Sequence, residues 1–450
     1  MNNSIRMIGL SVWFVSASVF ATCTKLNTTN QAYLSAEAQS AGYYVSNNFV
    51  GAADGYYGQY GLPSVININS GSNFQPYGSV LASATTSFLG SANSTPYGNQ
   101  QVLFRCDLSD KDDLWEYYSV NGDDGYAGQH DVPDIPGAYY SDYRYAAFRL
   151  TNLVTGEYYS RYWKARKLNP DDMFQDSNYI YVHAGLFSDV SIEVLKVTEE
   201  PYKNYGVNYG RFTPTALRVQ GYIAFKGGGR SAGLTVGCDH GGGCYSGWYG
   251  DWPGGWGWAN QVTFIRGAFC QVSDYTPVVT IPKTTAASLN SGMPSQANFT
   301  IGLSCELGAE SGTTSNTSTS LTATRPIAIG LLANSANAVS QAELLGLKTA
   351  GGGLTYLLSN DYGNAGVAEG VGIKIYDDSG TAMNFLPSPT TGTGNSGGWY
   401  GFKEVTQLES TGTSLETYRG HFTASLEKIS GETATPGTVY AQAQIIVTFQ

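Results

Sequence analysis

Charged residues are scarce in this chain of 450 residues, because Asp, Glu, Lys and Arg together make up 13% of it, against about a quarter in an average soluble protein. The 24 Lys and Arg are scattered along the sequence, and the formal net charge is −11. No cationic surface is therefore expected that could neutralise the phosphates of a nucleic acid. We do not expect nucleic acid as a partner.

Long apolar runs are lacking after the first residues. Residues 7–20 form one such run behind Arg6, and small residues close it, which is the pattern of a secretory signal with cleavage after Ala21. Cys23 lies close enough behind the run to leave a lipoprotein open, although Thr22 is a poor residue in front of a lipid-bearing Cys. No later stretch approaches the roughly 20 apolar residues that cross a bilayer. We expect the mature chain, from residue 22, to be exported and soluble.

Catalytic motifs are also missing. No G-x-S-x-G elbow surrounds a serine, and the chain has only four His. The many Asp residues offer carboxylate pairs for a glycosidase but no geometry. We therefore expect no enzyme and no cofactor. His240 is the single histidine that we single out, as a ligand contact or as a metal ligand.

Glycine and tyrosine are abundant, with 56 Gly and 33 Tyr, beside many Ser and Thr. This composition suits strands and turns better than long helices. The chain also exceeds the size at which one hydrophobic core keeps growing. The sequence therefore predicts an all-β protein built from two β-sandwich domains.

Six cysteines fall in the mature chain, and an even number in an exported protein indicates disulfides. Six cysteines allow 15 pairings, and the sequence alone does not choose among them. Spacing favours three pairs, Cys23 with Cys106, Cys238 with Cys244 and Cys270 with Cys305. A zinc site would need spacings such as C-x2-C, which the segment from Cys238 to Cys244 does not offer. No metal is expected.

The last twelve residues alternate between apolar and polar, which predicts a half-buried strand from Val439 to Gln450. The strand runs to the last residue with no partner after it, so it either pairs inside its own sheet or leaves an edge for another chain. The pattern alone leaves both open. One face carries Val439, Ala441, Ala443, Ile445, Val447 and Phe449.

Three further alternating segments precede this strand, 299–305, 370–375 and 418–426, and the second runs into the turn Asp377–Gly380. Together with the Cys270 and Cys305 pair, the segment Gly420-His-Phe-Thr-Ala424 and the ending Phe449-Gln450, they resemble the pilin domain of chaperone–usher fimbriae over roughly residues 268–450. The family more often ends in Tyr-Gln.

The resemblance implies an incomplete immunoglobulin-like sandwich for residues 269–450. In this family a periplasmic chaperone lends the missing strand, and the donor strand of an adjacent pilin subunit later replaces it, by β-strand addition. An outer-membrane usher and export through the periplasm to the fimbrial tip are implied in the same way. The residues expected at the open edge are those of the apolar face above, with Gln450.

A large region, residues 22–268, stands in front of this pilin domain, where an ordinary pilin has only a donor strand. That arrangement resembles the two-domain tip adhesins of the same fimbriae. It implies a lectin-like, receptor-binding domain that attaches to a host or surface ligand, either a glycan or a matrix protein, and that caps the pilus. The alternative is a minor structural pilin or a fibre-initiating cap that binds no receptor.

Two segments of this front domain could hold the ligand. The first is rich in Trp and Gly between Cys238 and Trp258, and aromatic rings among turn-forming glycines suit an exposed contact loop. The alternative is that these Trp belong to a satellite core. The expected contacts are Tyr245, Trp248, Tyr249, Asp251, Trp252, Trp256 and Trp258, with His240. One strand over 259–269 would place this loop at the pole of the domain opposite Cys270.

The second segment is acidic and rich in tyrosine, over 107–145. Asn121, Asp123 and Asp124 could hydrogen-bond sugar hydroxyls above a floor of Tyr side chains. The alternative is a solvated loop in which Asp and Asn bond their own backbone. A calcium site is not favoured, since no D-x-[DN]-x-[DN]-G pattern occurs.

Overall fold

The computed structural model describes residues 22–51, 58–198, 201, 210–215, 219–244, 249–314 and 325–450. The predicted signal segment 1–21, Tyr245, Trp248 and the side chain of Tyr249 lie outside the described residues. Among the described residues, strands dominate and helices are short. The expected all-β fold class is confirmed.

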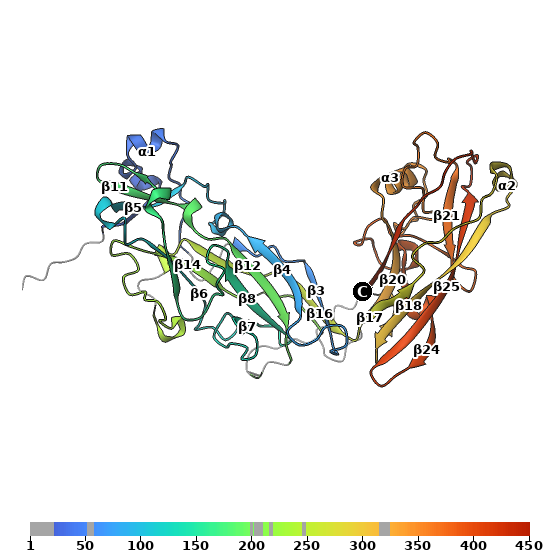
Figure 1. Ribbon diagram of the computed structural model, residues 1–450, viewed down its shortest axis with the longest axis horizontal. Coiled ribbons are helices and arrows are strands. Elements are labelled where there is room, and N and C mark those ends of the chain that lie inside the picture. The colour runs from blue at the N-terminus through green and yellow to red at the C-terminus, as the bar shows by residue number, and fades with distance from the viewer. Residues whose placement is uncertain are drawn as a thin grey trace, which may run out of the picture.

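The described chain forms two lobes (Figure 1). The N-terminal lobe has a main core of residues between Cys23 and Phe264, and the C-terminal lobe has one of residues between Ile265 and Phe449. The strands of the N-terminal lobe are β1 (Thr24–Lys25), β2 (Gly58–Gln59), β3 (Val65–Asn69), β4 (Val80–Thr86), β5 (Val102–Asp107), β6 (Trp115–Val120), β7 (Ala138–Tyr140), β8 (Ala146–Asn152), β9 (Lys164–Lys167), β10 (Phe174–Gln175), β11 (Tyr179–His183), β12 (Val190–Lys196), β13 (Arg211–Phe212), β14 (Gly221–Lys226), β15 (Gly254–Gly257) and β16 (Thr263–Gly267).

The helices of this lobe are short, because the sequence offers caps but no long apolar helical stripe. Asn27 caps η1 and Ser35 caps α1, each by accepting a backbone N–H with its side-chain oxygen. The helices are η1 (Thr28–Tyr33), α1 (Ala36–Ser40), η2 (Phe88–Ser91), η3 (Leu108–Asp110), η4 (Pro170–Asp172), η5 (Ala184–Leu186), η6 (His240–Gly242) and η7 (Tyr249–Asp251).

The described part of the N-terminal lobe contains four small sheets, in the orders β1-β5-β11-β10, β4-β12-β8-β7, β13-β16-β3 and β2-β15-β14-β6-β9. A single core cluster joins all four, with Phe104 of β5, Ile192 of β12, Phe264 of β16 and Ile223 of β14. The Cys23–Cys106 disulfide ties β1 to β5 inside this core. Long-range strand pairing thus holds the lobe together, and its β-branched and aromatic residues fill the interior.

In its described part, the C-terminal lobe packs two sheets around a main core. Its elements are β17 (Cys270–Tyr275), α2 (Ala286–Asn290), β18 (Ser295–Glu306), β19 (Glu310–Ser311), β20 (Pro326–Ala333), α3 (Ala336–Leu344), β21 (Val371–Tyr376), β22 (Ala382–Met383), η8 (Asn395–Gly397), β23 (Trp399–Gly401), α4 (Phe402–Val405), β24 (Gln407–Thr411), β25 (Leu415–Lys428) and β26 (Ala443–Phe449). One sheet has the order β17-β18-β25-β21-β22, with β24 also on β25. In the other, β20 pairs with β19, β23 and β26.

The alternating segments of the C-terminal region form strands as predicted. Segment 299–305 lies in β18, 370–375 continues into β21, and 418–426 lies in β25. Gly380 has a φ of +79° and its N–H bonds Asp377 O at 2.9 Å, which closes the expected turn after β21. The last strand is shorter than expected, because β26 covers Ala443–Phe449 rather than 439–450.

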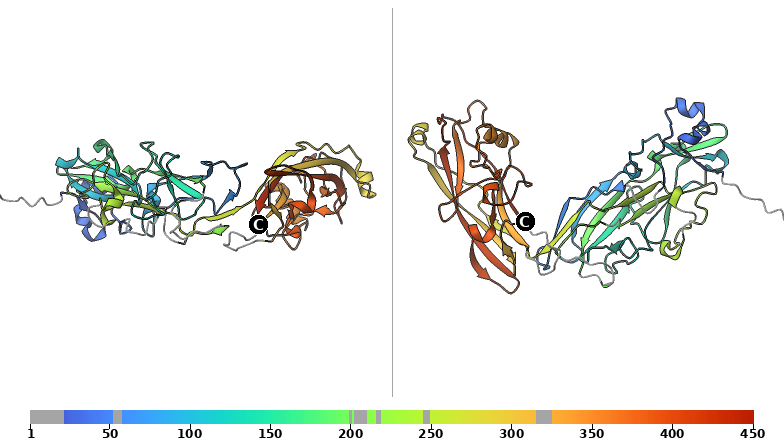
Figure 2. Two further views of the ribbon diagram at one scale, coloured as in Figure 1. Left: turned by 90° about the horizontal axis from the view of Figure 1, so that it is seen from below. Right: turned by 180° about the vertical axis from the view of Figure 1, so that it is seen from behind.

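The connection between the lobes differs from the expectation. The strand predicted over 259–269 is present but shorter than expected, since β16 covers Thr263–Gly267, and the next strand, β17, starts at Cys270. Asn260 has a φ of +57°, which ends the extended backbone before β16 begins. Figure 1 shows β16 and β17 at the narrow junction between the lobes, and both views of Figure 2 agree. A strand of five residues is too short to cross the N-terminal lobe. The argument that the Trp-rich loop lies at the pole opposite Cys270 therefore fails.

Candidate functional site

The free edge of β26 is the first candidate site, in the C-terminal lobe. Strand β26 pairs antiparallel with β20, in a register that runs from Ile327 opposite Phe449 to Ala333 opposite Ala443. Gln450 N donates to Pro326 O at 2.9 Å, so the even-numbered residues of β26 exchange hydrogen bonds with β20. The backbone groups of the odd-numbered residues then point to the opposite edge. Within the described chain, no strand pairs with that edge.

The side chains of these odd-numbered residues complete the lobe's core. Phe449 is buried and its ring lies 5.1 Å from that of Phe269, while Ile445 and Val447 are only partly buried against the same core. Val279 and Ile281, from the segment after β17, also cover that core while partly exposed. Partly exposed apolar side chains beside unpaired backbone groups can accept a strand from another chain.

The expected edge residues differ in their surroundings. Ala441, Ile445, Val447 and Phe449 pack against the main core of the lobe, and Val439 packs against a smaller cluster near α2. Ala443 is exposed, and Gln450 makes the last bond to β20. Ile446, on the other face, packs near Trp399 and was absent from the expected set.

The Trp-rich segment is not an exposed contact loop in its described part. Trp252, Trp256 and Trp258 each have 0% of their surface exposed. Trp256 and Trp258 belong to the main core, and Trp252 packs in a satellite core with Trp163 and Tyr222. The expectation of ligand contact is therefore wrong for these three residues, because strand β15 and its flanks carry them into the interior. The satellite-core alternative is correct for Trp252, whereas Trp256 and Trp258 lie in the main core.

Asp251 also has a structural partner. Its carboxylate forms an ion pair with Arg230 at 3.2 Å, and Arg230 Nε donates to Cys23 O at 2.9 Å. Lys25 Nζ donates a hydrogen bond to the carbonyl oxygen of Gly250, next to Asp251, at 2.7 Å. Burial, with Arg230 adding to it and Asp251 opposing it, lowers the pKa of Lys25 to about 8. These contacts hold the segment beside β1 and the first disulfide.

His240 is buried rather than available to a ligand, with 0% of its surface exposed. Its ring stacks on Tyr222 with an interplanar angle of 8°, and Nδ1 accepts a hydrogen bond from Gly122 N at 3.2 Å. Burial lowers its pKa to about 4, with Asp239 opposing and Arg161 adding to the shift. The expectation that His240 contacts a ligand is wrong in this structure. No cluster of three or more metal-ligating side chains occurs among the described residues.

The loop around His240 is tightly anchored. The Cys238–Cys244 disulfide closes it as predicted, and Trp163 Nε1 donates to Cys244 O at 2.8 Å. The Asp239 carboxylate accepts hydrogen bonds from Arg161 Nε at 3.0 Å and from Arg161 Nη2 at 2.7 Å. These bonds with Arg161 hold the pKa of Asp239 below its usual value. The predicted Cys23–Cys106 and Cys270–Cys305 bridges are confirmed as well.

The acidic segment behaves largely as a turn. Asn121 is buried, and its side-chain amide donates to Gln220 Oε1. Asp124 Oδ1 accepts Tyr126 N at 2.9 Å, so it bonds nearby backbone. Asp123 is exposed and Asp124 partly so. The structure therefore removes Asn121 from the expected contacts and leaves only the two carboxylates accessible.

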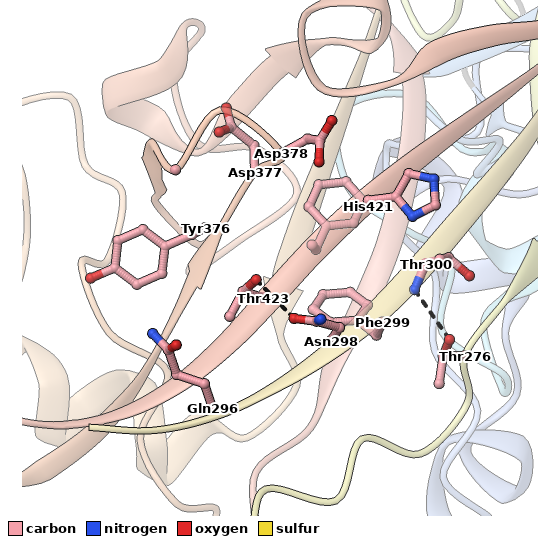
Figure 3. A pocket seen from close by; sticks show the side chains of 12 residues that line it. Thr276, Gln296, Asn298, Phe299, Thr300, Tyr376, Asp377, Asp378, His421 and Thr423 are labelled. Atoms are coloured by element: carbon pink, nitrogen blue, oxygen red, sulfur yellow. Dashed lines mark hydrogen bonds between the residues drawn. The ribbon is translucent and has the colours of Figure 1, made fainter. Parts of the chain in front are cut away.

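A polar pocket of about 680 Å³ lies on the outer face of the sheet that contains β18 and β25 in the C-terminal lobe. Figure 3 shows Asn298 and Thr300 on β18, His421 and Thr423 on β25, and Asp377 after β21. Thr423 Oγ1 donates to Asn298 Oδ1 at 3.1 Å. This bond joins the neighbouring strands β18 and β25 and stabilises the sheet.

A second cleft, between α1 and the sheet of β5 and β11, lies in the N-terminal lobe and was missed by the sequence analysis. Its residues come from three separate parts of the chain, 32–37, Arg105 and 174–181. No local motif marks them, because strand pairing brings them together. The alternation of Tyr179 and Tyr181 around Ile180 was the only available signal.

Comparison with known proteins locates a family in the C-terminal region. The family model described as "Fimbrial protein" matches residues 260–450. The C-terminal region therefore carries a fimbrial domain, as the resemblance in the sequence implied. No curated protein matches the chain.

Two solved structures are similar over different lengths. The rod subunit PapA of the P pilus is 15% identical, covers 40% of this chain and 92% of its own, and has a TM-score of 0.22. The CupB6 tip adhesin from Pseudomonas aeruginosa is 12% identical, covers 89% of this chain and 94% of its own, and has a TM-score of 0.24. At these scores neither alignment supports an argument about this chain's site. No helix in the described part of the chain is long and apolar enough to span a membrane.

Proposed function

We propose that this chain is the tip adhesin of a chaperone–usher pilus, without enzymatic activity. The observation that carries the proposal is the free edge of β26 in a lobe that matches a fimbrial domain, with a second large lobe in front of it. Residues 269–450 would join the fibre through this edge. Residues 22–268 would recognise a glycan or a matrix protein on a host or other surface.

The partners follow from the chemistry of an open strand edge. An added strand would bond the free N–H and C=O groups of the odd-numbered residues of β26, and its apolar side chains would cover Ile445 and Val447. In this proposal, a periplasmic chaperone supplies that strand first, during export after removal of the signal segment. An adjacent pilin subunit supplies it at the outer-membrane usher. After assembly, the protein is located at the fimbrial tip on the cell surface.

A paired set of substitutions tests the edge. Val447→Asn places an amide on the partly buried core side, while Gln444→Asn changes an exposed residue of the same strand and serves as the matched control. We expect the first variant to disappear from purified fibres and the second to be incorporated normally, as measured by immunoblotting of sheared pili. Equal incorporation of both variants would contradict assembly through this edge.

The position and role of the chain need a second measurement. Immunogold labelling should find it at fibre tips, and cells that lack it should retain fibres but adhere less than the parent strain. If cells without the chain adhere as strongly as the parent, while fibre number falls, the chain is a fibre-initiating cap and the adhesin proposal fails.

A further inference from the structure

A cleft of about 550 Å³ in the N-terminal lobe has an aromatic and charged lining. Its floor is the sheet β1-β5-β11-β10, in which Arg105 lies opposite Tyr181, and Tyr181 lies opposite Phe174. One wall is formed by the segment of η1 and α1, with Tyr33 and Glu37. Because the three floor residues share one row across the sheet, their side chains stand on the same face.

Arg105 is held by the aromatic residues around it. Its guanidinium carbon lies 3.9 Å from the ring centroid of Tyr179 and 4.5 Å from that of Tyr33. Within the described chain, Arg105 makes one hydrogen bond, from Nη1 to Tyr33 O at 3.3 Å. Its remaining N–H donors are therefore available at the cleft. Tyr33 itself is 46% exposed, so part of its ring can still pack against a ligand.

Asp176 supplies a fixed carboxylate to the lining of the cleft. Its Oδ2 accepts a hydrogen bond from the Tyr181 hydroxyl at 2.7 Å. Its Oδ1 accepts hydrogen bonds from the backbone N–H groups of Asn178 and Tyr179, at 2.9 and 2.8 Å. Burial acts to raise its pKa, but these hydrogen bonds and one from Ser35 outweigh burial and lower the pKa. The carboxylate is thus oriented and ionised at neutral pH, and it retains acceptor capacity for a ligand.

The position of the cleft suits recognition at the end of a fibre. Figures 1 and 2 place α1, β5 and β11 at the end of the N-terminal lobe farthest from β16 and the C-terminal lobe. The neighbouring residue of Arg105 is Cys106, whose disulfide to Cys23 fixes this part of β5 to β1. The cleft is therefore held on strands and a covalent bridge rather than on a free loop.

We propose that this cleft is a binding site for a neutral saccharide, which deepens the proposed adhesin function and rests on it. A pyranose combines an apolar face with several hydroxyl groups. Tyr33 offers a ring for the apolar face, and Arg105, Asp176 and the exposed amide of Asn178 offer donors and acceptors for the hydroxyls. The lining of the cleft carries one cation, Arg105, and two carboxylates, Asp176 and Glu37, so the cleft has one surplus negative charge. A sialylated or sulfated sugar is disfavoured on that ground.

The test uses the mature full-length chain on an array of neutral and sialylated oligosaccharides, followed by titration with the best neutral ligand. We expect Tyr33→Ala and Arg105→Gln each to weaken binding at least tenfold with little change in the thermal midpoint. Tyr77→Ala removes a tyrosine of similar exposure, 42%, outside the cleft and should leave binding unchanged. Tyr162→Ala removes another, 49% exposed, next to Arg161 near the Cys238–Cys244 loop, and should also leave it unchanged.

Three results would overturn the inference. They are binding restricted to sialylated glycans, loss of binding in Tyr162→Ala but not in Tyr33→Ala, and a wild-type chain that binds no glycan at all. If no glycan binds but cells lacking the chain still lose adhesion, the saccharide site is refuted while the adhesin function stands. Unchanged adhesion of those cells would instead refute the adhesin function.

Discussion

Acidification should destabilise the N-terminal lobe through His240. The imidazole is fully buried among Trp163, Tyr222 and Trp252, and its Nδ1 accepts the Gly122 N–H. Protonation would turn that acceptor into a second donor and place a charge in an aromatic interior. Of the charged groups beside it, Asp239 favours the charged imidazolium and Arg161 opposes it, and burial outweighs both.

The magnitude follows from the shift in pKa. The folded pKa is about 4, against 6.5 for an unperturbed histidine. Each unit corresponds to about 1.4 kcal/mol, so protonation costs the lobe about 3 kcal/mol. Between pH 6.5 and 4 the unfolded chain binds this proton and the folded chain does not. The stabilisation is therefore complete above pH 6.5, declines as the pH falls, and is fully lost below about pH 4.

The assay compares the mature chain with its His240→Gln variant in thermal unfolding between pH 7.5 and 4, followed by tryptophan fluorescence. Glutamine can still accept the Gly122 N–H but does not titrate. Across this pH range, the thermal midpoint of the wild type should fall by roughly 6 to 12 °C more than that of the variant. This uses about 2 to 4 °C per kcal/mol for a lobe of this size. His421→Gln, at an exposed position of β25, is the control and should follow the wild type. If the thermal midpoints of the wild type and His240→Gln fell in parallel as the pH is lowered, the reasoning would be refuted.

Two further predictions concern stability. Trp252→Ala should lower the free energy of unfolding of the N-terminal lobe by about 3 to 5 kcal/mol, because it opens a cavity in the satellite core; urea denaturation measures this, and partly exposed Trp115→Ala should cost clearly less. Replacing Cys270 and Cys305 with Ser should cost the C-terminal lobe about 4 kcal/mol in the chain-entropy model, for a separation of 35 residues. The same replacement of Cys238 and Cys244, which are separated by 6 residues, should lower the free energy of unfolding of the N-terminal lobe by about 2 kcal/mol. An equal loss in both double variants would argue against loop entropy as the source.

The sequence by itself predicted those features that depend on neighbours along the chain. Alternation with a period of two predicted β18, β21 and β25, because successive side chains of a strand point to opposite faces. The turn at Asp377 followed from the same local chemistry, and the C-terminal match to a fimbrial domain followed from local motifs. The spacing of the cysteines favoured the three pairs that form.

Tertiary structure alone decided which aromatic residues are interior and which meet solvent. The Trp and Gly pattern around β15 is the same for an exposed loop and for a buried strand, and only pairing of β15 with β14 and β2 places Trp256 in the core. The cleft at Arg105 likewise depends on β5, β11 and α1, which are far apart in the sequence. Burial and the juxtaposition of distant strands are properties of packing, so no local pattern could determine them.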